Sequence, residues 1–233
     1  MKKTIAFILA LLMILSVTAF AADEEDFTPE PGAHWETVSS GVKVWKNSIG
    51  SKWVHAWIEI RNTGTEPLFL SPASMDLEDA SGDLAQTLSS VSAYPQILMP
   101  GEVGVYDECT LADDDLPMKD LTVTSRLDVE PAKRSCIRYD VTSLKIKTDK
   151  LKQTKATGRI ENGTEEPADG MIYVAVLCYN KKGAYLGTLW TIVTDDIPAG
   201  DRQGFETMGA DFEVKAEDVG SPVAYAYPYQ FQF

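Results

Sequence analysis

The sequence repeats itself, and this repeat constrains the fold more than any other feature. Three pairs of segments match at nearly the same spacing, about 100 residues apart: RNTGTEP at 61–67 with ENGTEEP at 161–167, DASGDLAQTL at 79–88 with NKKGAYLGTL at 180–189, and ILMPGE at 97–102 with DIPAGD at 196–201. The three matches keep their order, so we infer a tandem duplication. Each copy has the length of a β-sandwich domain.

Short strands separated by turn residues dominate both copies. The first copy contains VHAWIEI at 54–60, followed by an Asn-Thr-Gly-Thr turn. The second contains the apolar run MIYVAVLCY at 171–179, followed by a hairpin at 180–183. Strands bounded by Gly, Asn, Asp and Pro, without a helical period, are typical of a sandwich of antiparallel sheets. The sequence therefore predicts an all-β chain.

Residues at equivalent places in the two copies resemble a known family. They are MDLED at 75–79 and VLCYN at 176–180, each preceded by an Asn turn and followed by a Gly hairpin and a Pro-Gly bend. This arrangement resembles the FxLYD-type Ig-like domains of exported bacterial proteins. Neither copy has Phe first, the first lacks Tyr, and the second has Cys and Asn in place of Leu and Asp. The resemblance implies two tandem Ig-like antiparallel β-sandwiches, an extracellular or envelope role, and no catalytic residues.

The N-terminus has the features of a secretory signal peptide. Lys2 and Lys3 precede an apolar core at 5–15, and Ala-Phe-Ala at 19–21 fits a cleavage site. We expect a secreted protein, extracellular or in the cell envelope. The expected organisation is a signal peptide at 1–21, an acidic flexible leader at 22–33, a first Ig-like sandwich at 34–130, a joint at 131–134 and a second sandwich at 135–233.

The charge of the exported chain excludes some partners. Loss of Lys2 and Lys3 leaves 19 basic and 35 acidic side chains, a formal net charge of −16. Nucleic acid and anionic membrane surfaces would repel such a chain. No later apolar run is long enough to span a membrane. We expect no nucleic-acid partner, no membrane insertion after cleavage, and a monomer.

Two tryptophans stand where a half-buried strand should be polar. In the segment 53–60 Val54, Ala56, Ile58 and Ile60 form one apolar face, and the other face carries Trp53, His55, Trp57 and Glu59. The equivalent positions of the second copy, 153, 155 and 157, are polar. Trp53 and Trp57 lie ~13 Å apart along a strand, a spacing that suits successive sugar rings. The four residues are our candidate ligand or partner site. The alternative is that the second copy, or the aromatic C-terminal segment at 224–233, covers this face.

The residues available for catalysis are few. His34 and His55 are the only histidines, and no Ser-His-Asp or zinc spacing can be assembled. The acidic stretches at 76–83 and 113–115 lack the spacing of a calcium loop, and we interpret them as a hairpin and a solvated loop. We expect no enzyme, no cofactor and no metal.

Three cysteines allow at most one internal disulfide. Cys109 and Cys136 are the only plausible pair, and the alternative is that all three are thiols. Cys178 occupies the position of Leu77 in the first copy, so we predict a buried thiol there.

The sequence thus predicts a secreted, non-enzymatic binding or interaction module at or near a bacterial cell surface. Its partner is expected to be an unknown protein or polysaccharide. Two alternatives remain open. One is a structural spacer or accessory subunit without a ligand, and the other is a carbohydrate-binding protein that uses an exposed tryptophan platform.

Overall fold

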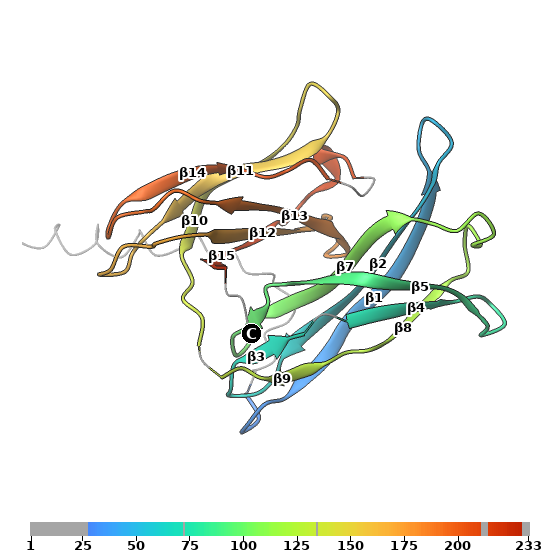
Figure 1. The fold of residues 1–233 in the computed structure, drawn as a ribbon, viewed down its shortest axis with the longest axis horizontal. Helices are drawn as coiled ribbons and strands as arrows, with labels where there is room; N and C mark the ends of the chain where they lie inside the picture. Colours follow the sequence, from blue (N-terminus) through green and yellow to red (C-terminus); the bar gives the residue numbers. More distant parts are fainter. Residues whose placement is uncertain (1–27, 72, 134, 211–213, 230–233) are drawn as a thin grey trace, which may run out of the picture.

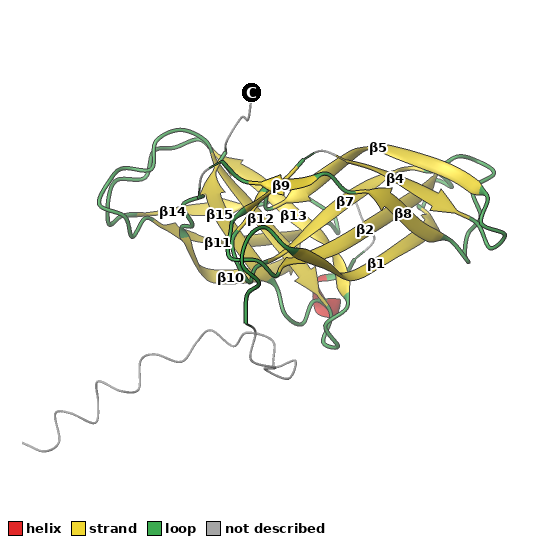
Figure 2. Cartoon of the chain, turned by 90° about the horizontal axis from the view of Figure 1, so that it is seen from below, coloured by secondary structure: helices red, strands yellow, loops and turns green. Residues whose placement is uncertain are grey.

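The computed structural model describes residues 28–71, 73–133, 135–210 and 214–229. Apart from one 3₁₀ turn, Ala216–Asp218, its regular elements are strands joined by turns (Figure 2). The sheets are antiparallel, and the prediction of an all-β sandwich is confirmed. The strands are β1 Trp35–Lys46, β2 Lys52–Asn62, β3 Leu68–Leu70, β4 Ala73–Glu78, β5 Leu84–Tyr94, β6 Ile97–Leu98, β7 Val103–Leu111, β8 Thr122–Arg126, β9 Val129–Pro131, β10 Asp140–Thr148, β11 Thr154–Glu161, β12 Ile172–Tyr179, β13 Tyr185–Val193, β14 Arg202–Glu206 and β15 Val223–Pro228.

Residues 28–131, the first half, form one long sheet and one short one. The long sheet has the order β1-β2-β7-β5-β4-β8, and the short one has the order β6-β3-β9. Apolar side chains from both sheets meet in one core, because alternate residues of each strand point to the same side. The largest fully buried side chains of this core are Ile60, Leu68, Leu70, Met75, Leu77, Leu98, Tyr106 and Leu116.

Residues 135–229, the second half, form a sandwich of two three-stranded sheets. The outer sheet has the order β10-β11-β14, and the inner sheet has the order β13-β12-β15. Their facing side chains make a second core, which includes Ile160 of β11, Val176 of β12 and Leu189 of β13. Figure 1 shows the inner sheet between the outer sheet and the strands of the first half. The inner sheet therefore faces a core on one side and the first half on the other.

The repeat seen in the sequence has a counterpart in the turns. Four hairpin turns begin with an Asn or Asp whose side-chain oxygen accepts hydrogen bonds from the backbone N–H groups two and four residues later, at 2.8–3.1 Å. Such side-chain caps are the reason why Asn and Asp favour turns. The four residues form two equivalent pairs, Asn47 with Asp149 and Asp79 with Asn180.

A buried asparagine makes the same contacts in each half. The amide of Asn62 donates to the carbonyls of Glu66 and Leu98, at 2.8 and 2.9 Å. The amide of Asn162 donates to the carbonyls of Glu166 and Ile197, both at 2.9 Å. Each asparagine thus joins a turn to the segment that precedes a later strand, β7 in the first half and β14 in the second. This contact explains why the NxGT-like and Pro-Gly segments keep their spacing.

Two of the expected boundaries differ in the structure, namely those of the flexible leader and of the joint. The predicted signal peptide lies outside the described residues. Of the predicted flexible leader, residues 28–33 belong to the fold, because the Glu30 N–H donates to the Thr63 carbonyl and the Glu30 carbonyl accepts from Thr65. In the predicted joint, Pro131 ends strand β9. The division into two Ig-like domains stays a prediction. Among the described residues, no helix is long and apolar enough to cross a membrane.

Candidate functional site

The two faces of β2 are as the sequence predicts. Val54, Ala56, Ile58 and Ile60 are buried in the first core. His55, Trp57 and Glu59 point to the other side of the long sheet, together with their neighbours Val105 and Asp107 on β7. The question left by the sequence is what this second face contacts.

The inner sheet of the second half covers this face. Leu177 and Tyr179 of β12 and Tyr185 of β13 are buried in one cluster with Val105, and Trp57 packs against it. His55 and Glu59 are only 2% and 4% exposed. The candidate ligand residues His55, Trp57 and Glu59 therefore lie at an internal contact between the halves, the arrangement described by the alternative in which the second copy covers this face. We call this contact the interface.

The two tryptophans lie in different surroundings. Trp57 packs over the backbone of Gly41 on β1, and its ring lies 5.8 Å from that of Tyr185. Trp53 lies farther along β2 and stacks on Trp45, with ring centroids 6.4 Å apart. Trp53 and Trp57 are both half-buried, so they do not form the exposed platform of the carbohydrate-binding alternative.

A polar network crosses the interface. The Nε2 atom of His55 lies 3.1 Å from Oδ2 of Asp107. The Tyr185 hydroxyl donates to the same Oδ2 and lies 2.6 Å from Oγ1 of Thr188. Burial and the Asp107 carboxylate raise the pKa of Tyr185 well above its usual value, so the hydroxyl remains a donor. A buried carboxylate costs free energy unless such partners are present.

Glu59, which lies on β2 opposite Val105 of β7, has a comparable environment. The Ser39 hydroxyl donates to Oε2 of Glu59. On the other side, burial and the nearby Glu59 carboxylate raise the pKa of Tyr179. Each of the two buried carboxylates of the interface is thus associated with a tyrosine of the second half.

Arg138 connects the halves at the other end of the interface. Its guanidinium donates to both carboxylate oxygens of Glu102, at 3.0 and 2.7 Å, and to the Ile97 carbonyl. It also lies over the rings of Tyr225 and Tyr227, at 5.6 and 5.3 Å from their centroids. A bidentate, stacked arginine of this kind orients the groups that it joins.

The cysteines are present as thiols, so the predicted Cys109–Cys136 bridge is not formed. Cys136 clusters with Ile97 and lies near Glu102, at the start of β7. Cys109 lies near the far end of β7. Seven residues of strand separate Glu102 from Cys109, ~23 Å at ~3.3 Å per residue, whereas a disulfide needs Cα atoms within ~7 Å. The predicted buried thiol of Cys178 is confirmed.

We expect Cys178 to resist thiol reagents in the native protein. It is completely buried, and burial followed by the charge of Asp107 raises its pKa to about 12. Since the thiolate is the reactive form, reaction at pH 8 should require unfolding. Titration with a chromogenic disulfide in denaturant, without reductant, should give three thiols. In denaturant the variant Cys178→Ala should give two reactive thiols where the wild type gives three. In the native state the variant and the wild type should give the same number.

The acidic stretches belong to turns and loops. Asp79 caps its hairpin, as the sequence interpretation expects, and its pKa is lowered by hydrogen bonds from Ser81 and Asp83. At 113–114 two backbone carbonyls accept from the Lys52 ammonium, at 3.3 and 2.8 Å. Within the described parts of the chain, no group of three His, Cys, Asp or Glu side chains could hold a metal ion.

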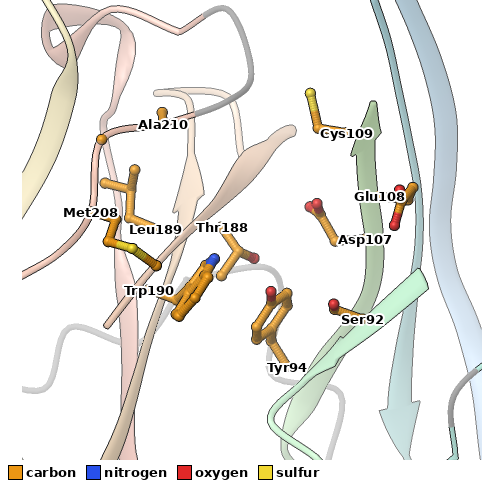
Figure 3. Close-up of a pocket in the computed structure, with 11 residues that line it drawn as sticks. Ser92, Tyr94, Asp107, Glu108, Cys109, Thr188, Leu189, Trp190, Met208 and Ala210 are labelled. Atoms are coloured by element: carbon orange, nitrogen blue, oxygen red, sulfur yellow. The ribbon is translucent and has the colours of Figure 1, made fainter. Parts of the chain in front are cut away.

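A cavity of about 270 Å³ lies at the edge of the interface, and we call it the cleft (Figure 3). One wall comes from β5 and β7 of the first half, and the other comes from β13 and residues 208–210 of the second half. Asp107 links the cleft to the buried network, and no motif in the sequence had singled this residue out. The lining residues are Ser92, Tyr94, Asp107, Glu108, Cys109, Thr188, Leu189, Trp190, Met208, Gly209 and Ala210.

No protein-family model matches this chain, and no curated protein matches it. A function for the chain therefore has to be inferred from the geometry of the interface and the cleft.

Proposed function

We propose that the chain is an exported, non-enzymatic binding protein that acts at or near a bacterial cell surface and takes its ligand in the cleft. The observation that carries this proposal is the cleft itself, which joins aromatic and hydroxyl side chains of both halves around one buried carboxylate, Asp107. A concave site in which a few polar groups converge beside aromatic side chains is a common form of a small-molecule site, and the walls of this cleft are mixed, with polar and apolar side chains side by side. The resemblance to FxLYD-type domains supports the exported location.

The buried network supports binding rather than catalysis. A general base must reach the proton that it removes, within about 3 Å. His55 is 2% exposed, and the rings of Trp57 and Tyr185 lie 5.2 and 6.2 Å from its own. Its Nε2 atom is already engaged with Asp107. A substrate in the cleft therefore meets the Asp107 carboxylate and not the imidazole.

A ligand screen by thermal unfolding tests the proposal. The protein from residue 22 onward is heated with neutral sugars, carboxylic acids and alkylammonium salts, each at millimolar concentration. A ligand at 100 times its Kd should add about 2.7 kcal/mol to the free energy of unfolding, a shift of several degrees. We expect at least one class to raise the Tm of the wild type.

The matched variants are Ser92→Trp and Ser90→Trp. Both serines are exposed on β5, but only Ser92 lines the cleft. Ser92→Trp should abolish the ligand-dependent shift, and Ser90→Trp should keep it. If no class raises the Tm of the wild type, the proposal is wrong, and the spacer alternative becomes the better one. The contacts of Arg138 and Tyr185 across the interface favour that alternative, because they hold the two halves in one orientation.

A further inference from the structure

The carboxyl group of Asp107 has one oxygen available to a ligand. Asp107 is 8% exposed. Its Oδ2 atom lies within hydrogen-bonding distance of His55 Nε2 and accepts a hydrogen bond from the Tyr185 hydroxyl. Among the described residues none donates a hydrogen bond to Oδ1, and Figure 3 shows the carboxyl group directed into the cleft, towards Thr188. A neutral imidazole can donate the hydrogen bond to Oδ2 through its Nε2–H group.

The walls of the cleft add aromatic surface on the side opposite Asp107. Trp190 stacks on Tyr173 with ring centroids 5.6 Å apart, and this contact fixes the indole at the edge of the cleft. Figure 3 shows Trp190 and Tyr94 on either side of the space below Thr188. The π-face of an indole attracts a cation within about 6 Å, by roughly 0.5–2 kcal/mol.

The electrostatic environment of the cleft is negative. Its lining residues include Asp107 and Glu108 and no Lys or Arg, and Figure 3 shows the Asp107 carboxylate on the cleft side of β7 and the Glu108 side chain on the other side of the strand. Burial, followed by the charge of Asp107, raises the pKa of the neighbouring Glu108. Arg138 lies at the other end of the interface, and Lys43 lies over Trp45 on β1, two strands away from β7.

We propose that the cleft binds a small organic cation, an alkylated ammonium whose charge lies between the Asp107 carboxylate and the rings of Trp190 and Tyr94. This inference rests on the proposed function and specifies the chemical class of its ligand. Ser92 on one wall and Thr188 on the other add hydroxyl groups to the lining of the same cleft.

Choline and 3,3-dimethylbutan-1-ol provide the test, because they have the same shape and differ in charge. Isothermal titration with the protein from residue 22 onward should show choline binding at least about tenfold more tightly than the neutral alcohol. Raising the salt concentration to 0.5 M should weaken choline binding and leave the alcohol unaffected. Equal affinities for the two compounds, or no binding of choline at 10 mM, would overturn the inference.

Trp190→Leu and Trp35→Leu are matched variants of this experiment. Trp190 lines the cleft, whereas Trp35 is 39% exposed at the start of β1. Trp190→Leu should lower the affinity for choline about tenfold, and Trp35→Leu should not change it. If a sugar or a carboxylic acid stabilises the protein and ammonium compounds do not, this inference fails while the proposed function stands. If none of them binds, both fail.

Discussion

Replacing Gly41 with alanine is expected to destabilise the protein by about 3 kcal/mol, the upper part of the range for overpacked cores. A Cβ atom at this position would overlap the ring of Trp57, which packs directly over the Gly41 backbone. Trp57 cannot move away freely, because the inner sheet encloses it from the other side. Urea unfolding should show a lower midpoint, and the tryptophan emission of the native variant should shift to longer wavelength.

Gly204→Ala is the control for this substitution. Gly204 also lies in a strand, β14, but the nearest atom to an added Cβ is 3.9 Å away, an ordinary contact. Its replacement should leave the stability unchanged or raise it by about 0.5 kcal/mol, through the entropy of the unfolded chain. If Gly41→Ala has the stability of Gly204→Ala, then Trp57 is not held between β1 and the second half.

Replacing Arg138 with alanine is the second large change, with an expected loss of about 3 kcal/mol. The variant loses two hydrogen bonds to Glu102, one to the Ile97 carbonyl, and two contacts with tyrosine rings. It also leaves the Glu102 carboxylate, which is 21% exposed, without its cation. Chemical denaturation monitored by both fluorescence and circular dichroism measures the change.

Two further variants show whether the loss comes from this ion pair. The exposed Arg159 of β11 serves as a control, and Arg159→Ala should change the stability by less than about 0.5 kcal/mol. In the double variant Arg138→Ala/Glu102→Gln the charge of Glu102 is absent, so the loss should be smaller than the sum of the single losses. Additive losses would mean that Arg138 and Glu102 act independently.

Much of the fold could be predicted because it depends on local patterns. The alternation of β2 identified its core face, and turn residues at matching positions revealed the repeat. The burial of Cys178 followed from its alignment with Leu77. The aromatic C-terminal segment was one candidate cover for the second face of β2, and Tyr225 and Tyr227 pack in clusters that include residues of the first half.

The interface could not be predicted in the same detail, because it depends on how distant segments meet. Asp107 acquires its role from His55, 52 residues earlier, and from Tyr185, 78 residues later. No spacing motif records such a contact. One signal was available, since the run MIYVAVLCY is apolar at almost every position and not at every second one. A continuous apolar strand indicates burial on both faces, and β12 is buried in this way.

The inner sheet is buried on both faces, by the second core and by the first half, and this arrangement has a consequence for a chain whose second half is not yet folded. The first half leaves the ribosome before the second, and until the second half arrives the surface around Trp57 and His55 is uncovered. The inner sheet of another copy carries the same complementary residues, Leu177, Tyr179 and Tyr185. The contact that closes one molecule therefore has the same chemistry as a contact between the first half of one copy and the second half of another.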